Sequence, residues 1–184
     1  METGKTDRRV QYTKRALTSA LIDLMRENHI SKISVKALGA AADVNRSTFY
    51  AHFRNQYDLL AYIEAEALED LKARLLADGE PRTRNVEKIL EYAKENADVF
   101  LMLLDESEGG FQRQIMELAH LVDLQMSDQD AAVDADDLEY MYLFAVSGAL
   151  GMLSHWLKKG TPQSPAEMSE LLMSMIQHGV EERA

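Results

Sequence analysis

The sequence predicts an all-α fold. Apolar residues recur at helical spacing along nearly the whole chain, and no run of alternating β-branched and polar residues is long enough for a strand. At 184 residues, 46 % of them hydrophobic, the chain can form one domain or two small ones with a sizeable core. It contains no cysteine, so we expect it to fold without disulfides or thiolate metal sites.

The first two helices are expected at residues 8–28, starting at residue 7 or 8, and 35–43. A leucine stripe marks the buried face of the first. Ser34 is a good N-cap for the second, and Asp43 follows it as a residue that tolerates the left-handed backbone conformation of tight turns.

A third, short helix is expected at residues 46–53, with Asn45 as its N-cap. Phe49 and Phe53 lie four residues apart and therefore point to the same side. The opposite side is left to polar residues, so this helix predicts a buried aromatic face and an exposed polar one.

A fourth helix should run from residue 55 or 56 to about residue 76, because Gly79 and Pro81 are end signals. Gly160 and Pro165 mark the end of one later helix and the start of the next. The later helices are expected at residues 83–104, 111–126, 137–159 and 165–180. This predicts an N-terminal domain over residues 1–55, a linking helix over about 56–77 and a helical domain over 78–184.

The charge of the chain is divided unevenly. Residues 1–60 carry ten Lys or Arg and six acidic residues, whereas the remaining 124 residues carry ten and 25. The N-terminal part is therefore basic in a chain whose formal net charge is -11. This asymmetry favours a basic contacting end, because Lys and Arg supply most of the non-specific affinity for nucleic-acid phosphates.

Two short helices joined by a tight turn form a helix-turn-helix, in which the second helix enters the major groove of DNA. Here the second helix would present Arg46, Ser47, Thr48, Tyr50 and His52 to solvent. Hydroxyl and guanidinium groups can read base edges. The alternative is a three-helix cap with a solvated polar face.

Residues 8–60 resemble the DNA-binding domain of the TetR family of bacterial regulators, through the stretch "SVKALGAAADVNRSTFYAHFRNQYDLL". The resemblance implies that Arg46, Ser47 and Thr48 read sequence, that Ser34 and Lys36 hold phosphates, and that Tyr50 and His52 meet the backbone or thymine methyl groups. The full set of expected DNA-binding residues is Ser34, Lys36, Asn45, Arg46, Ser47, Thr48, Tyr50, His52 and Arg54.

Three positions depart from the family pattern. Gly39 replaces an alanine and should loosen the second helix by less than about 1 kcal/mol. Asp43 replaces the turn glycine. Gln56 replaces a lysine that commonly meets a phosphate, so we expect that contact to be uncharged or to move to Arg54.

The segment "SGALGMLSHWLKKGTPQSPAEMSELLMSMI" resembles compact members of the same family, some of which regulate dihydroxyacetone kinase genes. Its glycines permit close approach of another backbone, and the last helix carries an apolar stripe. A homodimer formed by these two helices from each subunit is expected, because one recognition helix reads few bases. The interface residues would be Gly148, Gly151, Leu171, Leu172, Met175 and Ile176. The alternative is packing within one chain.

The resemblance also implies a small-molecule effector enclosed by residues 83–157. The candidate lining residues are Tyr92, Phe100, Met116, His120, Tyr140, Phe144, His155 and Trp156. Each is more often a core residue than a ligand contact. We expect no cofactor and no metal.

Two other classes of function are an enzyme and a protein-interaction factor. An enzyme is disfavoured because the helical metal-binding pair Glu117–His120 has no second copy, and phosphate loops and nucleophile motifs are lacking. A coactivator or protein-interaction factor with weak or no DNA binding stays open. No apolar run spans a bilayer and no signal sequence is found, so we expect a cytoplasmic regulator, most simply a ligand-released repressor of an operator in double-stranded DNA.

Overall fold

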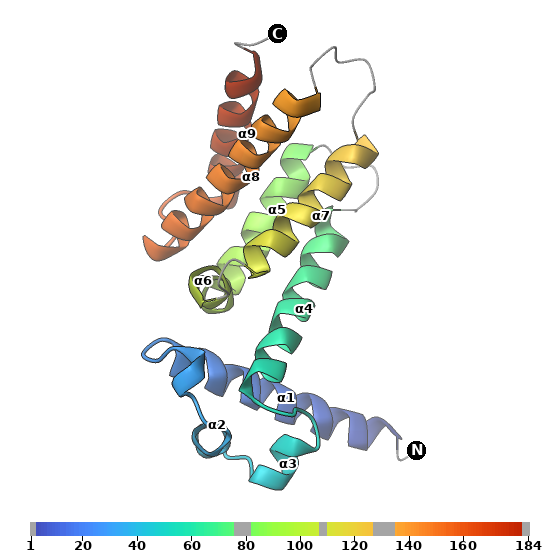
Figure 1. Cartoon of the computed structure of the whole chain (residues 1–184), viewed down its shortest axis with the longest axis vertical. Coiled ribbons are helices and arrows are strands. Elements are labelled where there is room, and N and C mark those ends of the chain that lie inside the picture. The colour runs from blue at the N-terminus through green and yellow to red at the C-terminus, as the bar shows by residue number, and fades with distance from the viewer. Residues whose placement is uncertain (1–2, 76–81, 107–109, 127–134, 182–184) are drawn as a thin grey trace. The chain divides into compact units, whose positions relative to one another are not determined.

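In the computed structural model the chain is a succession of helices (Figure 1). The structure describes residues 3–75, 82–106, 110–126 and 135–181, with side chains for 8–75, 83–105, 110–118 and 139–176. These residues contain no strand, as the sequence predicts. The chain forms two compact units, Met1–Ala67 and Leu68–Ala184, and the division falls within the predicted linking helix. Gly79 and Pro81, the predicted end signals of that helix, lie outside the described residues.

The N-terminal unit contains a helix-turn-helix. Its elements are α1 (Thr3–Met25), a 3-10 turn (Ile30–Lys32), α2 (Val35–Ala41), α3 (Arg46–Tyr50) and the first part of α4 (Gln56–Leu75). The first helix starts earlier and ends earlier than predicted. It ends at Met25 because the Asn28 amide donates to the Leu24 carbonyl (3.2 Å) and the His29 ring then caps the 3-10 turn.

The two predicted N-caps are confirmed. Ser34 Oγ accepts a hydrogen bond from the Ala37 N–H at 3.1 Å, and Asn45 Oδ1 accepts one from the Thr48 N–H at 2.8 Å. The expected turn conformation of Asp43 is also confirmed, since its φ is 52°. The regular part of α3 is shorter than predicted and ends at Tyr50.

The structure corrects our expectation for Gly39. We expected glycine there to loosen α2, but a Cβ at this position would lie 2.6 Å from the carbonyl oxygen of Val44. The chain folds back so closely because the Val44 N–H donates to the Gly39 carbonyl at 2.8 Å, which closes the helix end with Asp43 in the left-handed conformation. Glycine is therefore the residue that fits the turn.

Buried aromatic rings hold α3 in the N-terminal unit. Phe49 and Phe53 are buried, with ring centroids 6.0 Å apart, and Phe53 lies 5.5 Å from Tyr62 of α4. Lys14 of α1 lies 4.3 Å over the Tyr62 ring. Burial, together with the hydrogen bond that the Tyr62 hydroxyl donates to Glu66, raises the pKa of Tyr62 to about 12. These contacts tie α3, α4 and α1 together.

The C-terminal unit consists of the rest of α4 with α5 (Arg82–Glu95), α6 (Ala97–Glu106), α7 (Gly110–Met126), α8 (Ala135–Lys158) and α9 (Pro165–Glu181). The single helix predicted over residues 83–104 is wrong. It is interrupted at Asn96, whose side-chain amide donates to the Tyr92 carbonyl (2.9 Å), while its own carbonyl accepts the first hydrogen bond of α6 from Phe100 (3.1 Å).

The connection between α8 and α9 follows the predicted signals. Gly160 has φ 75°, and the Thr161 N–H donates to the Trp156 carbonyl at 2.9 Å, which ends α8. Ser164 and Glu167 then form a reciprocal capping box at the start of α9. Both predicted boundaries, Gly160 and Pro165, are thus confirmed.

Polar contacts join the helices of the C-terminal unit. The buried Ser169 hydroxyl of α9 donates to the Thr83 carbonyl of α5 at 2.8 Å. Lys158 of α8 pairs with Asp105 of α6 at 2.9 Å.

Among the described residues, no helix combines the length and apolar character that crossing a bilayer requires.

Candidate nucleic-acid interface

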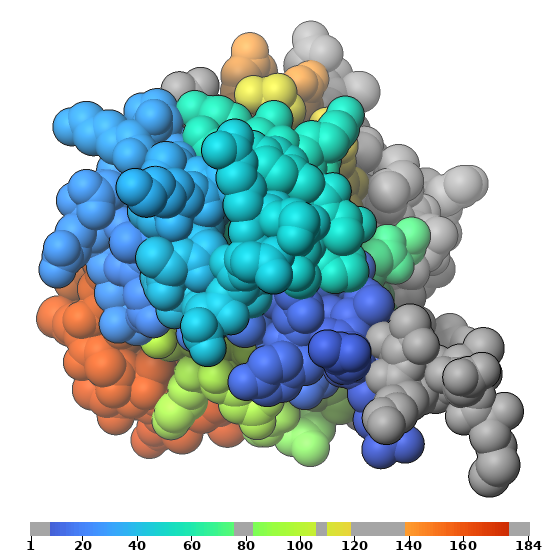
Figure 2. All heavy atoms as spheres, turned by 90° about the horizontal axis from the view of Figure 1, so that it is seen from below, coloured from blue at the N-terminus to red at the C-terminus, as the bar shows by residue number. Residues whose placement is uncertain are grey.

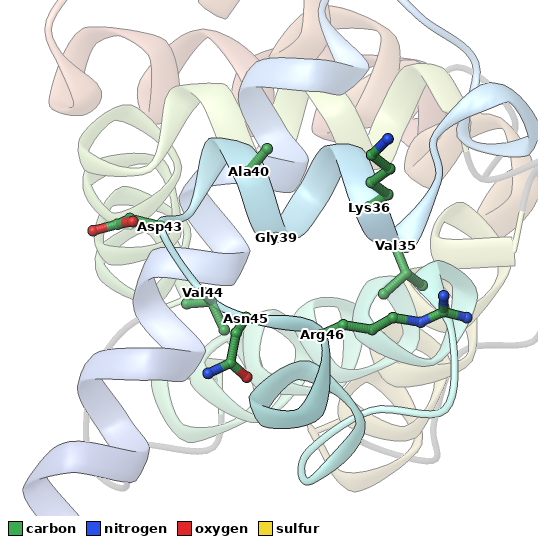
Figure 3. A pocket seen from close by; sticks show the side chains of 8 residues that line it. All are labelled: Val35, Lys36, Gly39, Ala40, Asp43, Val44, Asn45 and Arg46. Carbon is green, nitrogen blue, oxygen red and sulfur yellow. The ribbon is translucent and has the colours of Figure 1, made fainter.

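A hollow opens between α2 and α3 on the face of the N-terminal unit shown in Figure 2. It is lined by Val35, Lys36, Gly39, Ala40, Asp43, Val44, Asn45 and Arg46 (Figure 3). In that view Lys36 and Arg46 extend at one end of the hollow and Asp43 points outward at the other. The positive charge is therefore concentrated at the end of the hollow opposite Asp43.

Asn45 organises the hydroxyls at the start of α3. Its Oδ1 accepts three hydrogen bonds, from the Thr48 N–H (2.8 Å), the Ser47 hydroxyl (2.7 Å) and the Thr48 hydroxyl (2.9 Å). A carbonyl oxygen can only accept, so both hydroxyls act as donors here. Their lone pairs remain available, which makes Ser47 and Thr48 acceptors toward an incoming ligand.

The Ser34 hydroxyl is available to a ligand as a donor, whereas those of Ser47 and Thr48 are available as acceptors. Its Oγ accepts the Ala37 N–H, so the hydroxyl proton is left to donate to a ligand. Lys36, one residue into α2, is exposed. A hydroxyl donor beside an ammonium suits a phosphate oxygen better than a base edge.

Arg46 and Tyr50 interact along the exposed side of α3. Arg46 Nη2 donates to the Tyr50 hydroxyl at 3.4 Å, and the guanidinium carbon lies 5.4 Å from the ring centroid. The Tyr50 ring packs edge-on against Phe49 at 5.6 Å. Arg46 is thus positioned by a ring that is itself supported by the core.

Arg54 is engaged with Asp58 in the first turn of α4. Its guanidinium lies 2.7 Å from the Asp58 carboxylate, which also accepts the Arg54 backbone N–H at 2.9 Å. The Arg54 guanidinium lowers the pKa of the Asp58 carboxyl, with the Arg54 backbone N–H adding to the effect, and the Asp58 carboxylate raises the pKa of Arg54. His52 is half-buried beside Phe53, with ring centroids 6.4 Å apart.

Sequence analysis missed some lining or exposed residues of the N-terminal unit. Val35 and Val44 line the hollow. The only feature of the sequence that pointed to them was their position next to the N-cap residues Ser34 and Asn45. Tyr57 is an exposed tyrosine in the first turn of α4, next to Gln56. Gly39 was singled out for its effect on helix stability, whereas its role is the close approach of the Val44 carbonyl.

The predicted dimer residues lie along α8 and α9. Gly148, Leu172, Met175 and Ile176 line an apolar groove between these helices, and Gly151 and Leu171 are exposed. The exposed fractions of Phe144 (76 %) and Met175 (54 %) are large for apolar side chains. Within the chain, a Cβ at Gly148 or Gly151 would meet nothing within 4 Å.

The described side chains among the residues predicted to line an effector pocket do not share one cavity. Only Phe100 borders the apolar pocket inside the C-terminal unit, whereas Phe144 borders the α8–α9 groove and His155 borders a polar hollow beside Asp105. Tyr92 packs edge-on against Phe100, with ring centroids 5.5 Å apart, but does not line that pocket. Tyr140 is exposed, Tyr92 and Met116 are half-buried, Trp156 is buried with its indole N–H donating to the Gln163 carbonyl (3.1 Å), and the side chain of His120 lies outside the described residues. Among the described side chains, no three His, Asp or Glu residues are grouped as metal ligands would be.

Each half of the chain matches a known protein family. Residues 17–63 match the family described as bacterial regulatory proteins, tetR family. Residues 83–178, more than half of the chain, match the transcriptional regulator C-terminal region of the type TetR_C_8.

Named proteins are similar over most of their length. The dhaKLM operon transcriptional activator DhaS of Lactococcus lactis is 27 % identical over 143 residues, covering 74 % of each chain. A TetR transcriptional regulator from Streptococcus agalactiae superposes with a TM-score of 0.65 at 25 % identity, covering 95 % of this chain and 99 % of that one. NalD of Pseudomonas aeruginosa, the secondary repressor of the MexAB-OprM efflux pump, has the same fold, with a TM-score of 0.66 at 19 % identity, covering 92 % and 97 %.

Proposed function

The chain belongs to the TetR family of bacterial regulatory proteins, and from this membership we propose that its α2–α3 face is the operator-binding surface. Members of the family bind DNA operators and dimerise, so the protein is a DNA-binding transcriptional regulator. The family is one of transcriptional regulators and not a class of enzymes. The observation that carries the proposed surface is the Asn45 cap, which gathers two hydroxyls next to Arg46 at the start of α3.

Base reading is assigned in this proposal to Arg46, Ser47 and Thr48. Arg46 matches the two acceptors of a guanine edge, once it leaves Tyr50. The hydroxyls already donate to Asn45, so they suit donor groups on the bases, namely adenine N6 and cytosine N4.

Phosphate contacts are assigned to Ser34, Lys36 and Arg54, with Tyr50 and His52 against the backbone or thymine methyl groups. Ser34 and Lys36 are both exposed at the start of α2. Arg54 must exchange the Asp58 carboxylate for a phosphate, so its contribution to affinity is smaller than that of an unpaired arginine.

The homodimer is proposed to form through α8 and α9 of each subunit, in the groove lined by Gly148, Leu172, Met175 and Ile176. Two recognition helices separated by about 34 Å would then meet successive major grooves. A small molecule bound in the C-terminal unit would change this separation and release the DNA.

We propose repression, relieved by the effector, as the regulatory outcome. Two similar proteins differ on this point, since NalD is described as a repressor and DhaS as an activator. A reporter gene behind the bound promoter decides between the outcomes. Lower transcription in the presence of the protein supports repression, and higher transcription contradicts it.

The test of the function is binding of the full-length protein to DNA from upstream of its own gene, against unrelated DNA, over a salt series. Replacing Arg46 and Thr48 together by alanine should weaken specific binding by about 30-fold or more, because each base contact contributes about 1–3 kcal/mol. The matched control is Thr83→Ala with Arg84→Ala, which removes the same residue types from the start of α5.

Equal, weak binding to all DNA would contradict the proposal. It would favour the second candidate, a regulator of the same fold that acts through a protein partner. The uncharged Gln56 in the first turn of α4, where the family commonly has a lysine, is the specific feature that favours this alternative.

A further inference from the structure

The C-terminal unit contains a pocket of ≈ 210 Å³ whose described lining is entirely apolar. Each of its helices contributes, with Leu71 from α4, Val86 from α5, Phe100 from α6, Leu118 from α7, Val146 from α8 and Leu172 from α9 among the lining residues. Phe100 is completely buried, and Leu71, Leu118 and Leu172 are nearly so. A molecule in this pocket would be surrounded by hydrocarbon on all these sides.

From this lining we propose that the effector is a small, uncharged, apolar molecule, such as a one- or two-ring aromatic or a short alkyl compound. The inference rests on the proposed ligand-responsive function and names the ligand class. Transferring a polar group into such a site without a partner costs about 2–7 kcal/mol, and an ionised group costs more. Each buried CH₂ contributes about 0.8 kcal/mol in the opposite direction.

The size of the pocket bounds the ligand. An apolar cavity of roughly 150 Å³ binds benzene, whereas drug-sized ligands occupy about 300–1,000 Å³. A pocket of ≈ 210 Å³ lies between these limits and nearer the first. It therefore suits a molecule somewhat larger than benzene.

The pocket also borders the proposed dimer surface. Ala145, Ala149, Leu172 and Ile176 line both the pocket and the α8–α9 groove. A ligand in the pocket presses on these shared residues from the inside of the unit. Occupancy is thereby coupled to the spacing of α8 and α9.

The polar hollow beside the Lys158–Asp105 ion pair is a poorer candidate. Its lysine and aspartate already neutralise each other at 2.9 Å, and His155 is exposed at its edge. It offers a charged ligand no unpaired countercharge from that pair.

The experiment uses the full-length protein without DNA and two probes of the same shape, naphthalene and the charged 2-naphthoate. Calorimetry should show saturable binding of one naphthalene per chain and at least tenfold weaker binding of 2-naphthoate. Equal or tighter binding of 2-naphthoate overturns the inference, and so does the absence of saturable naphthalene binding.

Variants locate the site. Val146→Phe fills the pocket and should abolish naphthalene binding, whereas Val99→Phe, the same change at a half-buried position of α6 that lines neither the pocket nor the groove, should not. Val146→Thr keeps the size but adds a hydroxyl, and should weaken naphthalene binding several-fold even if Val146→Phe does not fold. Unchanged binding in both Val146 variants overturns the assignment to this pocket.

Failure of this inference is distinguishable from failure of the proposed function. Operator binding is measured on the same samples without a probe, and it tests the regulator alone. Naphthalene binding is measured without DNA, and it tests the pocket alone. Adding naphthalene to the operator complex should lower DNA affinity at least several-fold, and saturable binding with no change in DNA affinity would overturn the ligand's role as effector.

Discussion

The missing side chain of Gly39 makes room for the turn between α2 and α3. A methyl group there would lie 2.6 Å from the Val44 carbonyl oxygen, which belongs to the backbone and cannot rotate away. The residue at 43 accepts the left-handed conformation that the same turn demands. At position 39 this chain therefore has glycine where the family pattern has alanine, and at position 43 it has aspartate where the pattern has glycine.

Gly39→Ala tests whether the turn needs this missing side chain, because two effects of the substitution on stability oppose each other. Helix propensity alone favours alanine by about 1 kcal/mol, whereas forcing the turn open costs about 1–3 kcal/mol. We expect a net loss of stability in urea unfolding, together with weaker DNA binding. Stabilisation would show that the turn adapts without cost. The exposed neighbour Ala40→Gly serves as the control, since it should report propensity alone.

The donor and acceptor roles at Thr48 lead to a second prediction. Because its hydroxyl donates to Asn45, Thr48→Val should lose affinity only where a base amino group would have bonded to the hydroxyl oxygen. Once the operator is mapped, replacing the contacted adenine by purine, which lacks the N6 amino group, should remove the difference between wild type and Thr48→Val. A difference that persists on the purine-substituted DNA would contradict the assigned polarity.

Among the elements, α9 is defined by the local chemistry of its start. The Glu167 carboxylate accepts hydrogen bonds from the Ser164 N–H and hydroxyl, both at 2.8 Å, and the Ser164 N–H first, then its hydroxyl, lower the pKa of Glu167. A carboxyl with a lowered folded-state pKa stabilises the fold above its unfolded pKa. That contribution is lost as the pH falls from about 4 through the folded-state value.

Glu167→Gln should therefore lower the melting temperature at pH 7, and the difference from wild type should shrink as the pH approaches 3. Thermal unfolding between pH 7 and pH 3 measures this. The control is Glu170→Gln, an exposed change in the same helix. A difference that grows toward low pH would reverse the sign and exclude the proposed linkage.

At the scale of the whole molecule, the apolar side chains left exposed on α8 and α9 belong to the proposed dimer surface. Met175→Glu places a charge in the groove, and we expect the dimer dissociation constant to rise about tenfold or more, with parallel loss of operator binding. Analytical ultracentrifugation measures the first effect. Ala166→Glu, at an exposed position in the first turn of the same helix, should leave both unchanged. If Met175→Glu forms dimers with the wild-type affinity, the interface lies elsewhere.

The sequence by itself determined the helical class and the helix boundaries set by caps, such as those at Ser34, Asn45 and Gly160. These depend on hydrogen bonds within a few residues and on backbone conformations that particular residue types prefer, so local order along the chain suffices. The interruption at Asn96 was readable in the same way, as an Asn followed by Asp98 in the first turn of α6, and was missed.

Only the tertiary structure decided the role of Gly39 and the composition of the apolar pocket. The first depends on how closely the backbone returns after the turn, which no residue type announces. The second depends on which faces of six helices converge: of the candidates chosen from the sequence Phe100 lines the pocket, whereas Tyr140 and Phe144 are exposed and Trp156 is buried with its own hydrogen-bond partner. Contacts between distant segments are set by packing, and a single sequence records packing only through the size and polarity of the residues that take part in it.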